Sequence, residues 1–210
     1  MKLSEILDPK SGVNLANKQY KDIVYKKDLK ELQYDYDDIV EDLERRTRAE
    51  EEEDFTKIKI EEVKDKYRLN KGDLVFGLRV IKAGIVSERN AGKILTSNYV
   101  KLEVRDRYKD KVEPWYICYL LNEVDEVRNS MGLSQSEKEG ADGSATVKRL
   151  TKTDLMDVEL GDLPDFEVQN IVGKLYGAIC RREYAEKIKA KLTRKKELED
   201  ISKILKGEEY

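Results

Sequence analysis

The 210-residue chain contains no histidine, and it has only two cysteines and three prolines. Without histidine it lacks the side chain that most often serves as a general base near neutral pH. Two cysteines and no histidine also leave no ordinary zinc site. Cys118 and Cys180 have apolar neighbours in a helical pattern, so we expect both thiols to be reduced and structural. The composition therefore predicts neither a metal nor a cofactor.

Long apolar runs are absent as well. No stretch approaches 18 consecutive apolar residues, and the first residues, MKLSEILDPKSG, lack the apolar centre of a signal peptide. These absences predict a cytoplasmic protein without a membrane partner. The formal net charge is only −3, but the charges are unevenly distributed. Residues 165–206 carry eleven Lys or Arg against seven Asp or Glu, whereas residues 1–70 carry fifteen against nineteen.

Two familiar enzyme motifs are missing. AGIVSERNAGK has the glycines of a phosphate-binding loop, but seven residues separate Gly84 from Gly92 where the motif needs four, and Ile94 replaces the required Ser or Thr. The three prolines are separated, so there is no Pro-Pro-aromatic motif of amino-methyltransferases, and no Gly-rich loop suits a methyl-donor cofactor. We therefore expect a protein that is not an enzyme.

Residues 165–206 predict one long helix. Pro164 is the last proline, and Gly173 and Gly177 are the only glycines between it and Gly207, so roughly 40 residues can continue as helix. At 1.5 Å per residue this helix would be about 60 Å long, too long for the preceding residues to cover. We therefore divide the chain into a domain of residues 1–163 and a helical segment of residues 164–210 that docks on another helix or chain.

The apolar residues of this helix form a broad stripe in its first half and are sparse among Lys, Arg and Glu in its second half. The step from Leu192 to Leu198 breaks a strict heptad repeat, so we expect antiparallel helix pairing and not a long regular coiled coil. The alternative is an amphipathic helix that packs only on its own domain. The candidate pairing residues are Leu175, Ile179, Ile188, Leu192, Leu198, Ile201 and Leu205.

Residues 1–163 predict an α+β domain with a mixed, mostly antiparallel sheet. We expect Pro9 and Gly12 to turn the chain into a polar loop, and Pro114 to begin an apolar helix. A charged helix is expected over residues 37–53, and Thr153 is expected to cap a short helical turn. Alternating or apolar stretches predict strands at residues 58–60, 74–78, 80–81, 85–86 and 98–104.

Five stretches of the sequence, taken in order, carry a resemblance to a known family. They are LSEILDPKSG, KYRLNKGDLVFGL, VEPWYICYLLNEVDEVRNSMG, GSATVKRLTKTDLMDVEL and LPDFEVQNIVGKLYGAI. In this order they resemble one half of the DNA-specificity (S) subunit of type I restriction-modification systems, with Gln169 and Val172 at matching positions at the head of a helix. The stretch from Tyr34 to Glu53 departs from the family, and Phe166 stands where the family has a second proline.

The resemblance implies a non-catalytic subunit that recognises a specific sequence in double-stranded DNA. A full S subunit is similar to two such halves, each with one target-recognition domain and one shared helix. The expected partners are DNA methyltransferase (modification) subunits, with a restriction subunit as a further candidate. Self-association through the C-terminal helix, or pairing with a different half, would supply the second domain and read a bipartite site.

Candidate DNA contacts are polar side chains on three predicted loops, at residues 10–17, 87–93 and 134–148. Phosphates are bound by Lys, Arg and small donors, and base edges by Arg, Lys, Asn, Gln or Ser. Arg89, Asn90 and Lys93 rank first because they follow a predicted turn between strands. The full set is Lys10, Ser11, Lys82, Ser87, Arg89, Asn90, Lys93, Ser136, Lys138, Ser144 and Thr146.

Two other functions stay open at this point. The first is a coiled-coil interaction or regulatory protein that pairs with specificity subunits without reading DNA. The second is a metal-dependent nuclease, since Asp54, Glu62 and Lys64 could hold Mg²⁺ and activate water. Such triplets also arise by chance in a sequence with 40% charged residues, so the nuclease is the less favoured alternative.

Overall fold

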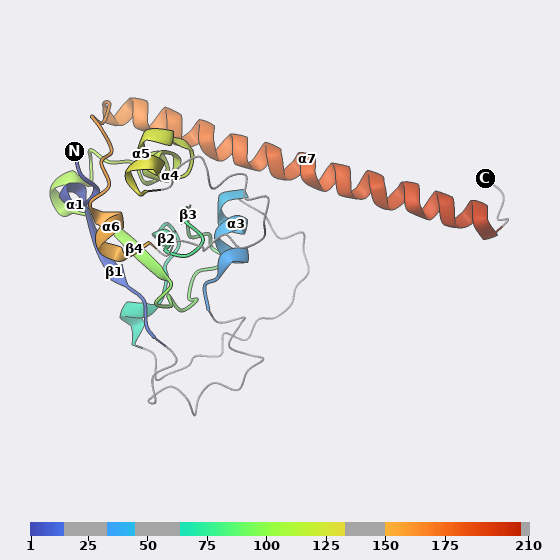
Figure 1. Cartoon of the computed structure of the whole chain (residues 1–210), viewed down its shortest axis with the longest axis horizontal. Coiled ribbons are helices and arrows are strands. Elements are labelled where there is room, and N and C mark those ends of the chain that lie inside the picture. Colours follow the sequence, from blue (N-terminus) through green and yellow to red (C-terminus); the bar gives the residue numbers. More distant parts are fainter. Residues whose placement is uncertain (15–32, 45–63, 133–149, 207–210) are drawn as a thin grey trace.

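A computed structural model describes residues 1–14, 33–44, 64–132 and 150–206, with side chains as far as residue 203. Figure 1 shows a domain over which a single long helix begins and then continues far past it. In this described part, no helix combines the length and apolar character needed to cross a membrane. The elements in chain order are α1 (Leu3–Ile6), β1 (Leu7–Ser11), α3 (Tyr36–Glu44), the 3-10 helix η2 (Asp65–Tyr67), β2 (Leu74–Gly77), β3 (Lys82–Ile85), β4 (Tyr99–Val104), the 3-10 helix η3 (Asp106–Tyr108), α4 (Pro114–Glu123), α5 (Asp125–Ser130), α6 (Lys152–Met156) and α7 (Phe166–Lys206).

The four strands form one antiparallel sheet in the order β1-β4-β2-β3. Leu102 of β4 lies opposite both Pro9 of β1 and Leu74 of β2, so β4 is a central strand. Leu74, Phe76 and Leu102 are buried in the main core, which also includes residues of α1, α4 and α6. The predicted α+β class with a mostly antiparallel sheet is confirmed.

The structure corrects the predicted turn at Pro9. Pro9 lies inside β1, opposite Leu102. Proline has no N–H to donate to a neighbouring strand, so within sheets it is confined to edge strands, strand starts and bulges. β1 is an edge strand, which explains how proline is accommodated there. Lys10 and Ser11 consequently belong to a strand and not to a loop.

Other predicted elements also differ in detail. Residues 80–81 form a turn between β2 and β3 and not a strand piece. Thr151, not Thr153, caps α6, because its hydroxyl accepts the backbone N–H of Asp154 at 3.1 Å. The predicted charged helix begins as α3, whereas its continuation to residue 53 and the predicted strand at residues 58–60 lie outside the described residues.

Helix α4 begins at Pro114, as predicted, and Glu113 caps it by accepting the backbone N–H of Tyr116 at 2.7 Å. Near its other end, the side-chain amide of Asn122 accepts the backbone N–H of Ala83 (2.8 Å) and donates to the carbonyl of the same residue (3.0 Å). These two bonds fix α4 to the edge strand β3. A buried amide placed in this way satisfies backbone groups that would otherwise be unpaired.

The long C-terminal helix is confirmed. α7 extends from Phe166 to Lys206 without interruption, close to the predicted bounds of 165 and 206. Its first half packs on α4, it also contacts α3, and its second half projects beyond the domain (Figure 1). Because 41 residues of helix are about 60 Å long, the projecting half is long enough to contact another chain.

Candidate nucleic-acid interface

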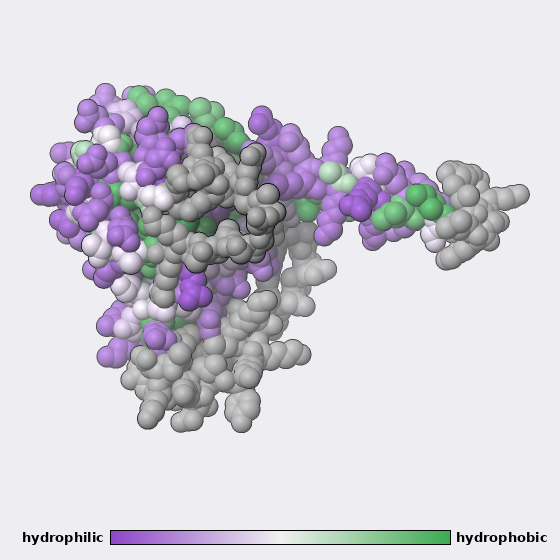
Figure 2. Space-filling view, in the orientation of Figure 1, coloured by the Kyte–Doolittle hydropathy of each residue, from purple (hydrophilic) through white to green (hydrophobic). Residues whose placement is uncertain are grey.

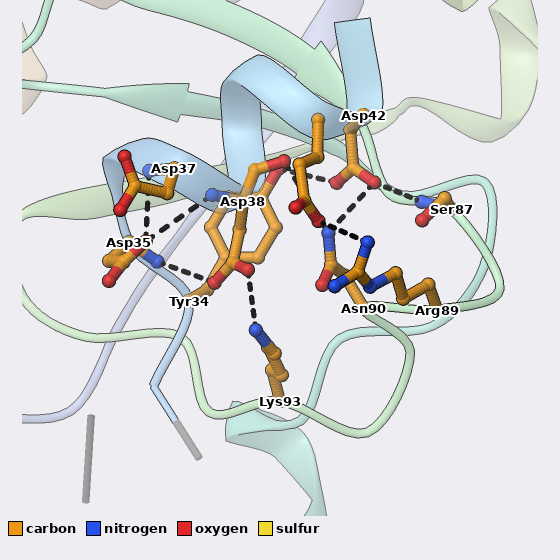
Figure 3. A network of polar contacts seen from close by, with 10 residues as sticks. Tyr34, Asp35, Asp37, Asp38, Asp42, Ser87, Arg89, Asn90 and Lys93 are labelled. Carbon is orange, nitrogen blue, oxygen red and sulfur yellow. Dashed lines mark hydrogen bonds and ion pairs between the residues drawn. The ribbon is translucent and has the colours of Figure 1, made fainter. Parts of the chain in front are cut away.

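α3 and the loop of residues 87–93 form one polar network (Figure 3). The carboxylate of Asp42, which is buried, accepts hydrogen bonds from the Tyr34 hydroxyl (2.7 Å), the Ser87 backbone N–H (2.9 Å) and the Asn90 side-chain amide (3.0 Å). Burial raises the pKa of Tyr34, and the negative charge of Asp42 raises it further, so the phenol stays protonated and can donate. Asp42 therefore fixes the shape of the 87–93 loop.

The two cations of this loop are paired with α3. Arg89 lies 3.2 Å from a carboxylate oxygen of Glu41, and Lys93 forms a short ion pair with Asp38. Burial raises the pKa of the Asp38 carboxyl, and the neighbouring Lys93 opposes that shift. A DNA phosphate that contacted Arg89 or Lys93 would therefore compete with a carboxylate that is already in place.

Asn90 does not fit the predicted direct contact with DNA. Its side chain is only 1% exposed, and its amide donates to Asp42 and to the Asp38 carbonyl. The Asn90 oxygen Oδ1 has no hydrogen-bond partner among the described residues. In this conformation Asn90 holds the loop together and cannot reach a base edge.

The remaining described candidates lie on opposite edges of the sheet. Lys10 and Ser11 belong to β1, at one edge, and the half-buried Lys82 belongs to β3, at the other. Lys10 lies 3.6 Å from Glu103, and the Ser11 hydroxyl accepts a hydrogen bond from the Lys152 ammonium at 3.2 Å. Lys10 and Ser11 thus contact β4 and α6, whereas the 87–93 loop bonds to α3.

Several other predicted site residues lie outside the described residues. Asp54 and Glu62, two members of the nuclease triplet, are among them, and the third member, Lys64, is exposed. Within residues 1–14, 33–44, 64–132 and 150–206, no group of three or more Cys, Asp or Glu side chains could hold a metal ion. The predicted DNA contacts that fall outside are Ser136, Lys138, Ser144 and Thr146.

Three residues anchor the first half of α7 to the domain. Gln169 is buried, accepts the backbone N–H of Glu113 (3.1 Å), and donates to the carbonyls of Lys111 (2.9 Å) and Pro164 (2.7 Å). One turn later, a side chain at Gly173 would meet Glu113 and the Cβ of Trp115, so glycine permits the close approach of α7 to α4. The Tyr176 hydroxyl, a turn further, accepts from Asn122 (3.0 Å) and donates to Glu123 (2.9 Å).

The opposite face of α7 has exposed apolar side chains. Val168, Ile171, Leu175 and Ile179 are 46%, 53%, 59% and 43% exposed, at steps of three or four residues that place them along one side. Figure 2 shows this apolar stripe as a green band along the outer surface of the domain. An uncovered apolar stripe at helical spacing is typical of a helix that pairs with another helix.

The predicted pairing residues therefore differ in their position along α7 and in how far their side chains are exposed. Leu175 and Ile179 belong to the outer stripe. Ile188 is half-buried, and the side chain of Leu205 lies outside the described residues. Leu192, Leu198 and Ile201, on the projecting half, are 60%, 57% and 53% exposed. None of the six pairing residues whose side chains are described is fully covered by the chain's own domain.

Sequence reasoning missed the role of α3. Asp38 and Asp42 lie in the charged stretch that was predicted to be a solvated helix. Both residues are nevertheless buried, and their carboxylates bind the 87–93 loop. A sequence signal was available, because Ile39 and Leu43 recur with a helical step beside these carboxylates and are buried. That step predicts that one face of the helix packs against the domain.

Neither a protein-family model nor a curated protein sequence matches the chain. Among solved structures, an S subunit of a type I restriction-modification system from M. genitalium is similar to this chain, with a TM-score of 0.53 and 14% sequence identity. The aligned region covers 100% of this chain and 46% of the M. genitalium chain. The chain has the fold of one half of an S subunit. An HsdS subunit from Thermoanaerobacter tengcongensis matches 62% of this chain and 32% of its own, with a TM-score of 0.41 and 17% identity.

The S-subunit fold accounts for the arrangement of the pieces, from the domain to the long C-terminal helix. This chain spans about half the length of the M. genitalium protein, so it has the fold of only part of that subunit. The resemblance predicted from short sequence stretches is thus confirmed at the level of fold.

Proposed function

We propose that this chain is one half of a DNA-specificity subunit, in which residues 1–163 recognise double-stranded DNA and α7 pairs with a second helix. The observation that carries this proposal is the shared fold with half of an S subunit, over the whole chain. A fold alone does not fix a function. The uncovered apolar stripe of α7 adds independent support, because it needs a partner of the kind that a second half would supply.

Two copies of this chain can supply two recognition domains. An antiparallel pair of α7 helices places the domains at opposite ends, related by a two-fold axis. Such a dimer would read a palindromic site made of two half-sites separated by a spacer. A different half with the same fold would also complete the assembly and would read an asymmetric bipartite site.

The proposed DNA contacts keep the predicted set, except for the buried Asn90. Arg89 and Lys93 are the leading described candidates, since their ion pairs with α3 can exchange for phosphates. The side chain of Arg89 is 37% exposed and that of Glu41 is 17% exposed, so a phosphate can reach Arg89 but has to displace a partly buried carboxylate. The other proposed contacts are Lys10, Ser11, Lys82, Ser87, Ser136, Lys138, Ser144 and Thr146.

The chain itself performs no chemistry in this proposal. Methylation is carried out by DNA methyltransferase subunits that the specificity subunit directs to the site, and a restriction subunit can join the same assembly. This division follows the resemblance to S subunits.

A second candidate is an interaction or regulatory protein that pairs with specificity subunits and does not read DNA. One observation favours it: both cations of the 87–93 loop are already paired with carboxylates of α3. Six Asp or Glu residues lie between Asp35 and Glu44, so this side of the domain carries substantial negative charge. Such a surface would repel phosphates unless the ion pairs rearranged.

Salt dependence of DNA binding separates the two candidates. A recognition subunit should bind duplex DNA with an affinity that falls steeply between 50 and 200 mM salt, since each phosphate contact contributes about 0.9 to the slope of log K against log salt. A protein that only pairs with specificity subunits should bind such a subunit and show no measurable DNA affinity. Fluorescence anisotropy with a labelled duplex, with and without a purified S subunit, measures both.

A further inference from the structure

The middle of α7 contains a segment of strong positive charge, which we call the basic segment, residues 181–196. It carries eight Lys or Arg residues against only Glu183 and Glu186. The carboxylates of α7 are otherwise confined to its start and to residues 197–200. A helix whose charges serve only solubility would alternate acidic and basic residues at four-residue steps. Here the two signs are separated.

Few of these cations are neutralised within the described chain. Arg182 lies 3.8 Å from Glu186, Lys195 lies 3.7 Å from Glu199, and Lys187 lies 3.6 Å from Glu44 of α3. The remaining five form no ion pair with another described residue, and all of them are exposed. They are Arg181, Lys189, Lys191, Arg194 and Lys196.

The spacing of the cations has a cost for the isolated helix. Lys187, Lys191 and Lys195 follow one another at four-residue steps, a spacing at which like charges repel. Lys187 reaches α3, so this row begins where α7 leaves the domain and continues along the projecting half (Figure 1). Binding of a polyanion would offset this repulsion.

We propose that the basic segment binds the phosphate backbone of duplex DNA next to the part held by the recognition domain, without regard to base sequence. This inference rests on the proposed function. The segment is about 24 Å long at 1.5 Å per residue, and a duplex presents one phosphate about every 3.4 Å on each strand. The segment therefore spans the axial rise of about seven base pairs, and its cations can contact those phosphates of either strand that face the helix.

Helix pairing strengthens this assignment. The midpoint of α7 is residue 186, inside the basic segment. An antiparallel pair that overlaps along its whole length would bring the two basic segments side by side and double the local positive charge. A duplex that is held by both recognition domains would run alongside the helix pair that separates the two domains. Its spacer phosphates are the anions best placed to neutralise this charge.

The test compares two charge variants of the full chain. The first replaces the four cations of the projecting half that lack a described ion pair, K189Q/K191Q/R194Q/K196Q. The matched control, K64Q/K66Q/R107Q/K109Q, removes four exposed positive charges of the domain, none of which lies on α7. Circular dichroism and molar mass establish that both variants keep the fold and the oligomeric state of the unmodified chain.

Binding is measured on two kinds of duplex. Selection from a randomised pool with the unmodified chain first identifies any preferred site. Anisotropy then compares a short duplex that holds one half-site with a long duplex that adds arbitrary flanking sequence. We expect the long duplex to bind more tightly than the short one, and the first variant to lose most of that gain. For the first variant on the long duplex, the slope of log K against log salt should fall by about 0.9 per lost contact. The control variant should keep both the affinity gain on the long duplex and the slope of the unmodified chain.

The outcomes separate this inference from the proposed function. A preferred site with no loss of long-duplex affinity in the first variant overturns the phosphate contact and leaves DNA recognition intact. No preferred site, together with charge-dependent binding of arbitrary duplexes, contradicts sequence-specific recognition but supports the phosphate contact. Unchanged DNA binding with lost capture of a purified methyltransferase subunit would assign the basic segment to a protein partner and overturn the proposal.

Discussion

The side-chain amide of Gln169, near the start of α7, accepts the backbone N–H of Glu113, the capping residue of α4, at 3.1 Å. Through its nitrogen the same amide donates to the carbonyl of Lys111, in the domain, and to that of Pro164, just before α7. One buried side chain thus ties the beginning of the long helix to the domain, and it sets the direction in which the helix leaves.

Replacing Gln169 by Ala should reduce the free energy of unfolding by about 1 to 3 kcal/mol, because a partly buried N–H and two partly buried carbonyls lose their partner. Urea denaturation followed by circular dichroism measures the loss. The control is Lys174→Ala, an exposed position of the same helix, which should change stability by less than about 0.5 kcal/mol. Equal effects of the two substitutions would show that Gln169 does not anchor α7.

Replacing Gly173 by Ala should destabilise the protein by about 1 to 3 kcal/mol through overpacking. The added Cβ would lie 2.8 Å from the Cβ of Trp115 and 3.2 Å from the backbone nitrogen of Tyr116, and neither atom can move freely. This loss has to exceed the gain of roughly 1 kcal/mol in helix propensity. In the control Ala178→Gly, on the exposed face, propensity alone should act. A more stable Gly173→Ala variant would contradict the close contact of α7 with α4.

The pH dependence of stability tests the ion pairs of the sheet. The hydrogen bond from Lys101 lowers the pKa of Glu103 below its ordinary value of 4.5, with Lys10 acting in the same direction. Because the folded state favours the charged carboxylate, the stabilisation is complete above about pH 4.5 and is lost as the pH falls through the lower folded value. Glu103→Gln should therefore be less stable than the unmodified chain at pH 7, and the difference should shrink below pH 4.5. The exposed Glu126→Gln serves as control, and a difference that grows in acid would refute the assignment.

The exposed stripe of α7 predicts the oligomeric state. At tens of micromolar, sedimentation or light scattering should give a mass of about twice the 24.4 kDa of one chain. Leu175→Asp with Ile179→Asp should lower the mass to that of a monomer, because buried unpaired carboxylates are costly at a helix interface. Lys66→Asp with Lys109→Asp changes exposed positions of the domain and should leave the dimer intact. A monomer from the unmodified chain, even with a methyltransferase subunit added, would argue against pairing through α7.

Much of this fold follows from local sequence patterns. The long helix was predictable because the residues after Pro164 lack proline and have apolar positions at helical steps. The antiparallel sheet was predictable from short alternating stretches with turns between them. Pro9 was misread because the sequence does not show that β1 lies at the edge of the sheet.

The polar network around α3 could not be predicted from local patterns. Ser87 and Asp42 are 45 positions apart in the sequence, and Asn90 and Asp42 are 48 apart. Such bonds depend on how strands and helices pack, which hydropathy and spacing do not specify. Asn90 was accordingly predicted to contact DNA, although the fold places it in the interior.

Selection of bound duplexes from a randomised pool, followed by sequencing, tests the central claim most directly. The proposal predicts enrichment of a palindromic site with two half-sites at a fixed spacing, read by two domains that paired α7 helices hold apart. A pool that stays random after repeated rounds, although the chain is folded and binds a specificity subunit, would contradict DNA recognition by this chain.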